Sequence, residues 1–166
     1  MNTISLRFDC EPMAMQSVKS AYVNGFVRHY QPQERINWKN NISIQARKQL
    51  PLGFVPLDGF IILSKAIFVF SPLKTFSKKD RLMLENGFLI RKDTKPDITD
   101  NLFKGLIDAL AGIVFVGDQK ICQMRGSIGK FYGLKPHIEL EFSMADSKFV
   151  KIENSQIINV NIENLK

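Results

Sequence analysis

One apolar stretch near the middle of the chain constrains the fold more than any other feature. Residues 60–70, FIILSKAIFVF, are rich in Ile, Val and Phe and carry a single charge, Lys65. An unbroken run of β-branched and aromatic residues is typical of a strand covered on both faces. The run is shorter than the roughly 18 apolar residues that a membrane span needs. We therefore expect a central strand of a sheet, with Lys65 extending its ammonium toward water.

Shorter periodic segments surround this strand. An apolar residue at every fourth position over residues 38–50 predicts a helix that ends at Pro51. Ser77 followed by Asp80 indicates a short capped helix. Alternating apolar residues predict strands over 4–8, 122–128, 138–142 and 158–162. The expected fold class is α/β in the two-layer α+β sense, a mixed β-sheet with a few packed helices.

Length and composition indicate the domain organisation. With 166 residues and 45% hydrophobic composition, the chain fits a single domain over 1–166 that buries one continuous core. The segment 143–166 reads as a C-terminal extension that adds a strand. Cys10 and Cys122 lie among apolar residues without CxxC spacing, so we expect buried thiols in a reducing compartment. The N-terminus has no signal-peptide pattern, and we expect a cytoplasmic protein with no membrane partner.

Charge points to a polyanionic partner. The chain has 23 Lys and Arg against 16 Asp and Glu, a net charge of +7, which attracts phosphate non-specifically. Residues 11–35 have no sustained period and predict a long loop or an irregular hairpin. This segment mixes basic residues with Tyr22 and Phe26, a combination that grips a phosphate backbone and stacks on bases. A solvated loop with a few anchoring aromatic residues is the alternative. The candidate phosphate contacts are Lys19, Arg28 and Lys130.

Carboxylates gather around one lysine in residues 95–121, KPDITDNLFKGLIDALAGIVFVGDQKI. Pro96 disfavours helix before it and Thr99 or Asp100 can cap, so we expect a helix that begins close to Asp100. At about 100° per residue the leucines of this helix share one face, and the charged residues share the opposite face. Asp97 precedes Asp100 by three residues and can point at the same spot. The charged face comprises Asp100, Lys104 and Asp108.

A further carboxylate follows this helix. The apolar run GIVFV, residues 112–116, predicts a strand with Asp118 in the turn beyond it. If that strand packs on the helix, Asp118 returns toward the helix start. Converging carboxylates repel one another, and bound Mg²⁺ or Mn²⁺ relieves the repulsion. Such an ion supports phosphodiester hydrolysis, with Lys104 neutralising charge on the phosphate. The ordinary alternative makes these residues a cap, surface ion partners and a turn former.

The same stretch resembles the signature of the RusA family of Holliday-junction resolvases, approximately PDxDNLxKxxxDALxG followed by an acidic pair and QI. The segments MNTISLRFD, RHYQP and KPHIELEF also occur in the family's order, so the resemblance covers about residues 3–142. It implies a small α/β homodimer that binds branched DNA, namely four-way junctions, and cleaves paired strands symmetrically with Mg²⁺ or Mn²⁺. No small-molecule cofactor is implied. Such genes are typical of phages and prophages.

The resemblance also implies roles for single residues. Asp100 matches the second acid of the motif, Lys104 its catalytic lysine, and Asp118 the second member of the later acidic pair. Asp97 matches the first acid when Thr99 is read as an inserted residue, and Gly117 stands where the acidic pair begins. The implied metal ligands are Asp97, Asp100 and Asp118, and Lys104 would stabilise the transition state.

Three functions follow from these observations. The first is a metal-dependent, structure-selective endodeoxyribonuclease, in which Asp108 has a supporting role. The second is a junction- or duplex-DNA-binding protein of the same fold that lacks cleavage, suggested by Gly117 and by the spacing between Asp97 and Asp100. The third is an unrelated α+β interaction domain.

Overall fold

A mixed five-stranded sheet forms the centre of the molecule. The structure is a computed structural model that describes residues 3–15, 19–23, 25–153 and 156–159. The sheet has the order β1–β7–β4–β6–β5, and β4 is antiparallel to β7 but parallel to β6. Its strands are β1 (Thr3–Phe8), β4 (Ile61–Phe70), β5 (Ile90–Arg91), β6 (Ile121–Tyr132) and β7 (His137–Met144). The predicted α+β fold and the central strand over 60–70 are confirmed.

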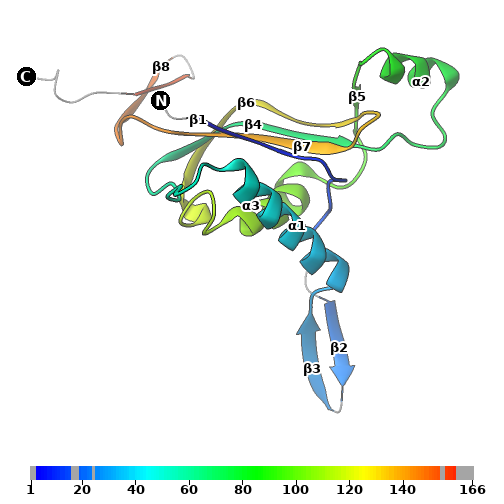
Figure 1. Ribbon diagram of the computed structural model, residues 1–166, viewed down its shortest axis with the longest axis horizontal. Coiled ribbons are helices and arrows are strands. Elements are labelled where there is room, and N and C mark those ends of the chain that lie inside the picture. Colours follow the sequence, from blue (N-terminus) through cyan, green and yellow to red (C-terminus); the bar gives the residue numbers. More distant parts are fainter. Residues whose placement is uncertain (1–2, 16–18, 24, 154–155, 160–166) are drawn as a thin grey trace, which may run out of the picture.

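The helices are unevenly distributed about this sheet. Helices α1 (Gln33–Gln49) and α3 (Lys104–Leu110) lie on one face, whereas α2 (Lys78–Glu85) stands beyond one end of the sheet (Figure 1). A π-helix, η1 (Ile98–Phe103), runs directly into α3, and a 3₁₀-helix, η2 (Asp118–Lys120), precedes β6. No described helix is both long enough and apolar enough to cross a membrane.

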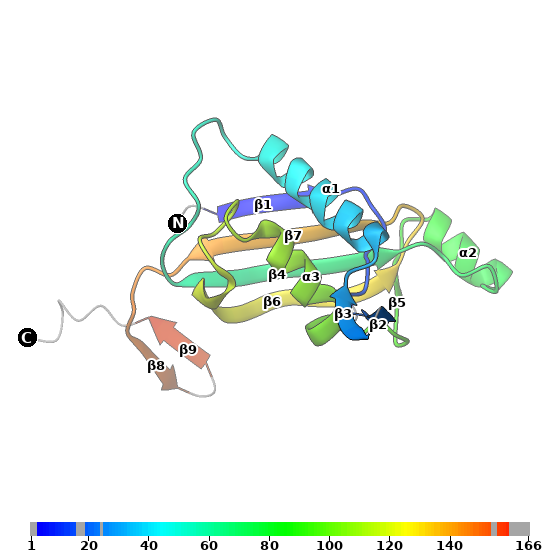
Figure 2. The ribbon, with the colours of Figure 1, turned by 90° about the horizontal axis from the view of Figure 1, so that it is seen from below.

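Two hairpins form separate two-stranded sheets. One consists of β2 (Lys19–Val23) and β3 (Phe26–Tyr30), and the other of β8 (Val150–Glu153) and β9 (Gln156–Asn159). The segment expected to be an irregular loop or hairpin therefore contains a regular one. In Figure 2 the hairpin β8–β9 lies beside the sheet near the C-terminus. The predicted last strand corresponds to β9, and its positions after 159 lie outside the described residues.

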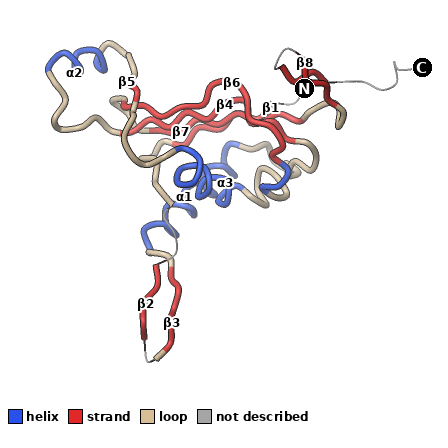
Figure 3. Tube along the Cα trace, turned by 180° about the vertical axis from the view of Figure 1, so that it is seen from behind, coloured by secondary structure: helices blue, strands red, loops and turns tan. Residues whose placement is uncertain are grey.

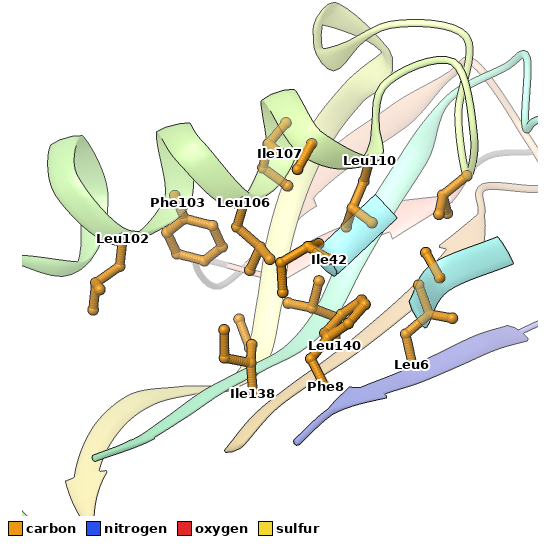
Figure 4. Close-up of a cluster of buried hydrophobic side chains, with 14 of the residues drawn as sticks. Leu6, Phe8, Ile42, Leu102, Phe103, Leu106, Ile107, Leu110, Ile138 and Leu140 are labelled. Atoms are coloured by element: carbon orange, nitrogen blue, oxygen red, sulfur yellow. The ribbon is translucent and has the colours of Figure 1, made fainter. Parts of the chain in front are cut away.

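The hydrophobic core lies between the sheet and the pair α1 and α3 (Figure 4). The predicted stripe of α1 is buried through Trp38, Ile42 and Ala46, because residues four apart share one face of a helix. Side chains of β1 and β7 meet this stripe from the sheet side. The buried leucines of the acidic motif complete this core, and they are Leu102, Leu106 and Leu110.

Charged side chains occupy the opposite face of the sheet. Glu139 on β7 accepts hydrogen bonds from Arg7 and Lys65, so Lys65 forms an ion pair instead of extending alone into water. The hydrogen bond from Lys65 holds the pKa of Glu139 below its usual value, and partial burial only partly opposes this. The network joins β1, β4 and β7 on the side that none of the described helices covers (Figure 1).

Three local expectations are wrong. Residues 112–116 form turns instead of a strand, and Phe115 pairs only through isolated bridges to Leu57 and Ala111. Cys122 is exposed on β6, where its thiol donates to the carbonyl of Ile61. The helix of the acidic motif begins at Ile98, close to Asp100 as expected, but its cap is Asp97 and not Thr99 or Asp100.

Candidate functional site

Asp97 caps the start of the continuous helix formed by η1 and α3, residues 98–110, which is called the acidic helix below. Its Oδ1 accepts hydrogen bonds from the backbone N–H groups of Asp100 at 3.1 Å and Asn101 at 3.0 Å. Its Oδ2 accepts from the side-chain amide of Asn101 at 2.5 Å. The first N–H groups of a helix have no partner within the helix, and a carboxylate at the cap supplies one. The carboxylate that was expected to be a metal ligand is therefore also the N-cap of η1.

The environment of Asp97 keeps its carboxylate ionised. Loss of hydration raises the pKa of this group, but the hydrogen bonds from Asn101 and Asp100 outweigh that effect and hold the pKa below its usual value. Hydrogen bonds to the charged form favour it over the protonated form. Asp97 therefore presents a negative charge at the helix start at neutral pH.

The predicted charged face of the helix exists as expected. Asp100, Lys104 and Asp108 are exposed, while the leucines of the same helix are buried. Among the described residues, Asp100 and Lys104 form no salt bridge, so both are available to a ligand. Asp108 pairs with Lys39 of α1 at 3.0 Å. This ion pair joins α3 to α1, in agreement with a supporting role for Asp108.

Lys130 anchors the turn that carries Asp97. Its ammonium donates to the carbonyl oxygens of Thr94 at 2.6 Å and Pro96 at 2.7 Å. Nearby, Lys92 donates to the hydroxyls of Thr94 and Tyr132. The turn before Asp97 is thus attached to β6 by two lysines. Sequence reasoning had Lys130 as a phosphate contact, and the structure places its ammonium on backbone carbonyls.

Asp118 lies far from the other predicted ligands. It begins η2, directly before β6, while Lys130 and the Asp97 turn lie at the opposite end of that strand. Lys130 is nine positions after Ile121 on β6, which corresponds to roughly 30 Å at about 3.3 Å per residue. The same turn holds an ion pair between Lys120 and Asp58 at 2.6 Å. Within one chain Asp118 does not return to the helix start.

One chain therefore does not by itself fit the implied three-carboxylate metal site. Among the described residues, no three Asp, Glu, His or Cys side chains are placed to hold one ion. Asp97 and Asp100 share one turn, and the oxygens of Asp97 already accept three hydrogen bonds. The roles of Asp97, Asp100, Lys104 and Asp118 stay predictions.

The other predicted DNA contacts lie on the hairpin β2–β3. Lys19 begins β2 and Arg28 lies on β3, and the side chains of both are outside the described part of the structure. Just before this hairpin, the backbone N–H of Met15 donates to the carbonyl of Asn101 at 2.9 Å. Sequence reasoning did not find this attachment, because Met15 and Asn101 are far apart in the chain and neither shows a pattern.

Comparison with known proteins assigns the chain to a family and identifies a relative. The sequence model of the family described as "Endodeoxyribonuclease RusA" matches residues 9–143. This region contains the acidic helix, Lys130 and Asp118. The uncharacterized protein YqaN of Bacillus subtilis (strain 168) is 27% identical over 143 residues, which cover 84% of this chain and 95% of YqaN.

Proposed function

Because this chain belongs to the RusA endodeoxyribonuclease family, we propose that it resolves four-way DNA junctions by hydrolysing paired phosphodiester bonds. The observation that carries the proposal is the exposed start of the acidic helix. Asp97 is held ionised there, and Asp100 and Lys104 project from the same face without ion-pair partners among the described residues. The net charge of +7 supplies the attraction to DNA.

The residues of this face have different tasks in the proposed reaction. Lys104 lies one helical turn after Asp100, where its ammonium neutralises charge on the scissile phosphate. Asp97 and Asp100 supply two carboxylates for a divalent ion, Mg²⁺ or Mn²⁺. Such an ion, when bound, activates water and stabilises the charge that develops in phosphodiester hydrolysis. A third carboxylate has to come from elsewhere, since Asp118 of the same chain is remote.

A second copy of the chain supplies that carboxylate in the proposed homodimer. Strand β6 borders β4 on one side, but on the other side β5 pairs only with Phe131 and Tyr132 among the described residues. The backbone N–H of Lys92 also donates to the carbonyl of Lys130, so within the described part of the chain the open stretch of this edge lies before Lys130, where Met124 and Ile128 are exposed. Long open edges with exposed apolar residues are ready to pair with another chain.

Antiparallel pairing of two β6 edges also brings acidic residues of the two copies together. In a two-fold pairing centred on Arg125, residue 120 of one copy lies opposite residue 130 of the other. This brings η2 with Asp118 of one copy to the Lys130 end of its partner, where the Asp97 turn is attached. The two copies would then form two equivalent sites, which suits symmetric cleavage of a junction.

The proposal is tested by incubating the protein with a labelled four-way junction and with a linear duplex of the same sequence. Each substrate is tested with Mg²⁺, with Mn²⁺ and with chelator. We expect paired, symmetric nicks in the junction that require the metal, and no cutting of the duplex. Metal-independent cutting, or equal cutting of duplex and junction, would overturn the proposal.

A second candidate function is a binding protein of the same fold that lacks cleavage. It is favoured by Gly117, which stands where the family has an acid, and by the two residues between Asp97 and Asp100. Junction binding that weakens steeply with salt, without nicks in either metal, would support this function over the first.

The cellular context is part of the proposal. Branched DNA arises where DNA is recombined and repaired, so a cytoplasmic location follows from the proposed substrate. Recombination and repair are the processes in which the activity would serve. An origin in a phage or prophage stays a prediction.

A further inference from the structure

The hairpin β2–β3 extends away from the body of the protein. Figure 3 shows it pointing away from the sheet and the helices, and among the described strands β2 and β3 pair only with each other. Each strand has five residues, which gives a reach of about 16 Å at roughly 3.3 Å per residue. A two-stranded hairpin alone is marginally stable in water. The hairpin therefore contributes little to the stability of the fold, and we infer that it has another function.

The hairpin carries aromatic residues that the protein leaves in water. Tyr22 is 77% exposed, Phe26 is 74% exposed, and Val27 beside them is 58% exposed. In the register of the hairpin Tyr22 is opposite Val27, and Phe26 is opposite Val23. Neighbouring pairs of a ladder point to opposite faces, so Tyr22 and Phe26 lie on opposite faces of the hairpin. Contiguous exposed apolar residues mark surfaces that bind a partner.

The base of the hairpin is attached to the acidic helix. The backbone N–H of Met15, four residues before β2, donates to the carbonyl of Asn101. The side chain of Met15 covers Gly105, where a Cβ would overlap it. At the other end, α1 begins three residues after β3, and Lys39 of α1 pairs with Asp108 of α3. The hairpin is therefore fixed to the same helix that presents Asp100 and Lys104.

Charge identifies the kind of partner. From residue 19 to residue 30 the hairpin contains Lys19, Arg28 and His29 but no Asp or Glu. A second copy of the same hairpin would bring like charges together, whereas a nucleic acid offers phosphates. Aromatic rings stack on exposed bases irrespective of sequence, and basic residues follow the backbone. Exposed aromatic rings on a basic hairpin thus fit DNA whose bases are accessible.

We propose that the hairpin β2–β3 is a wedge that enters the branch point of DNA held at the acidic helix, with Tyr22 and Phe26 stacking on bases. The inference rests on the proposed function and adds how that site distinguishes branched from linear DNA. In a linear duplex every base is paired and stacked, so insertion has to break stacking. At a branch point the stack is already interrupted, and the rings find partners at lower cost.

The test uses the double variant Tyr22→Ala/Phe26→Ala and a matched control. The control is Ile152→Ala/Ile157→Ala, an exposed pair that faces across the other hairpin. Binding is measured in chelator, so that no cleavage is needed. The DNA is a four-way junction with 2-aminopurine beside the branch point, and a linear duplex of the same sequence.

We expect the unaltered protein and the control to increase 2-aminopurine fluorescence in the junction, because the probe loses its neighbouring base stack. The Tyr22→Ala/Phe26→Ala variant should lose this increase and bind the junction at least about tenfold more weakly. Its affinity for the duplex should stay close to that of the unaltered protein. Far-UV circular dichroism and thermal unfolding check that all three proteins are folded.

Other outcomes have definite meanings. Unchanged junction affinity and fluorescence in the folded double variant would overturn the wedge, while leaving the proposed junction cleavage intact. A double variant that changes from dimer to monomer in size-exclusion chromatography would identify the hairpin as a contact between copies and overturn the wedge as well. If the unaltered protein fails to bind the junction, the proposed function itself is overturned, and the wedge with it.

Discussion

The ammonium of Lys130 lies 2.7 Å from the carbonyl oxygen of Pro96, the residue directly before Asp97. A strand of the central sheet thereby holds the turn that presents the first carboxylate of the motif. A lysine whose donors are engaged with the backbone acts on the geometry of a site more than on the phosphates around it.

Lys130→Met should therefore impair cleavage more than binding. Without the two hydrogen bonds the Asp97 turn loses its attachment to β6, and a small displacement of reacting groups lowers the rate at least about tenfold. We expect junction affinity and its salt dependence to change little, as measured by titration at several salt concentrations. A reduced salt slope with an equal loss of binding and cleavage would instead identify Lys130 as a phosphate contact.

Substitutions of Asp97 should separate its capping role from its charge. Asp97→Asn keeps an acceptor for the helix start, so the melting temperature should stay near that of the unaltered protein while metal-dependent cleavage is lost. Asp97→Ala removes the cap as well and should also lower the melting temperature by about 3 °C. Equal melting temperatures for the Asn and Ala variants would show that the cap contributes little.

Asp118→Asn should preserve junction binding and abolish cleavage. If the site is shared between two copies, mixing this variant with Asp97→Asn restores nicking, because each mixed dimer contains one site with both carboxylates. The mixture is refolded together and assayed on the junction, with each variant alone as the control. An inactive mixture that contains mixed dimers by mass would place all the required carboxylates in one chain.

Gly117→Asp restores the acidic pair that the family has at this position. The backbone of Gly117 is extended, with φ at −164°, a conformation open to any residue, and only the flexible side chain of Gln119 has to move. We expect faster metal-dependent nicking than with the unaltered protein. Gly117→Asn has the same size without the charge and is the control. Equal rates for both variants would mean that the missing acid does not limit the reaction.

Lowering the pH should reduce the stability of the fold, because Glu139 becomes protonated and loses its ion pair with Lys65. The pKa of Glu139 in the folded protein is lowered below its ordinary value of 4.5, chiefly by the hydrogen bond from Lys65. The corresponding stabilisation is therefore present above about 4.5 and is lost as the pH falls through the lowered folded-state pKa. The Glu139→Gln variant should have a lower free energy of unfolding than the unaltered protein at pH 7. Below about pH 5 its free energy of unfolding, measured by urea titration, should depend less on pH. Glu153→Gln, which breaks the exposed pair with Lys151, is the control and should change little.

Much of the architecture could be predicted because apolar residues repeat with the period of each element. The stripe of α1, the leucines of α3 and the alternation in β7 all lie on the buried faces that their spacing indicates. Residues 112–116 misled this approach, since a short apolar run has the same composition whether it is a strand or a buried turn. The hydrogen bond from the N–H of Val114 to the carbonyl of Leu110, together with the isolated bridges of Phe115, identifies the segment as a turn.

The site was harder to predict than the fold. The pattern correctly predicts that Asp100 and Lys104 share an exposed face, but it assigns the cap to Thr99 or Asp100, whereas Asp97 caps the helix. Asp97 accepts hydrogen bonds from two backbone N–H groups at the start of a π-helix, and a period of 3.6 residues anticipates neither the π-helix nor this cap. The separation of Asp118 from Asp97 depends on the direction and length of β6, and neither follows from their closeness in sequence.

The attachment of the Asp97 turn by Lys130 has a consequence for synthesis of the chain. Lys130 follows Pro96 by 34 residues, and the parallel pairing of β4 with β6 forms only after everything between them has been made. A chain still on the ribosome that has emerged only through α3 already has the motif's first two acids and its lysine, but not the strand that holds their turn in place. At that stage the chain lacks the contacts of Lys130, so the geometry of the Asp97 turn is fixed only once β6 has been made and has paired with β4.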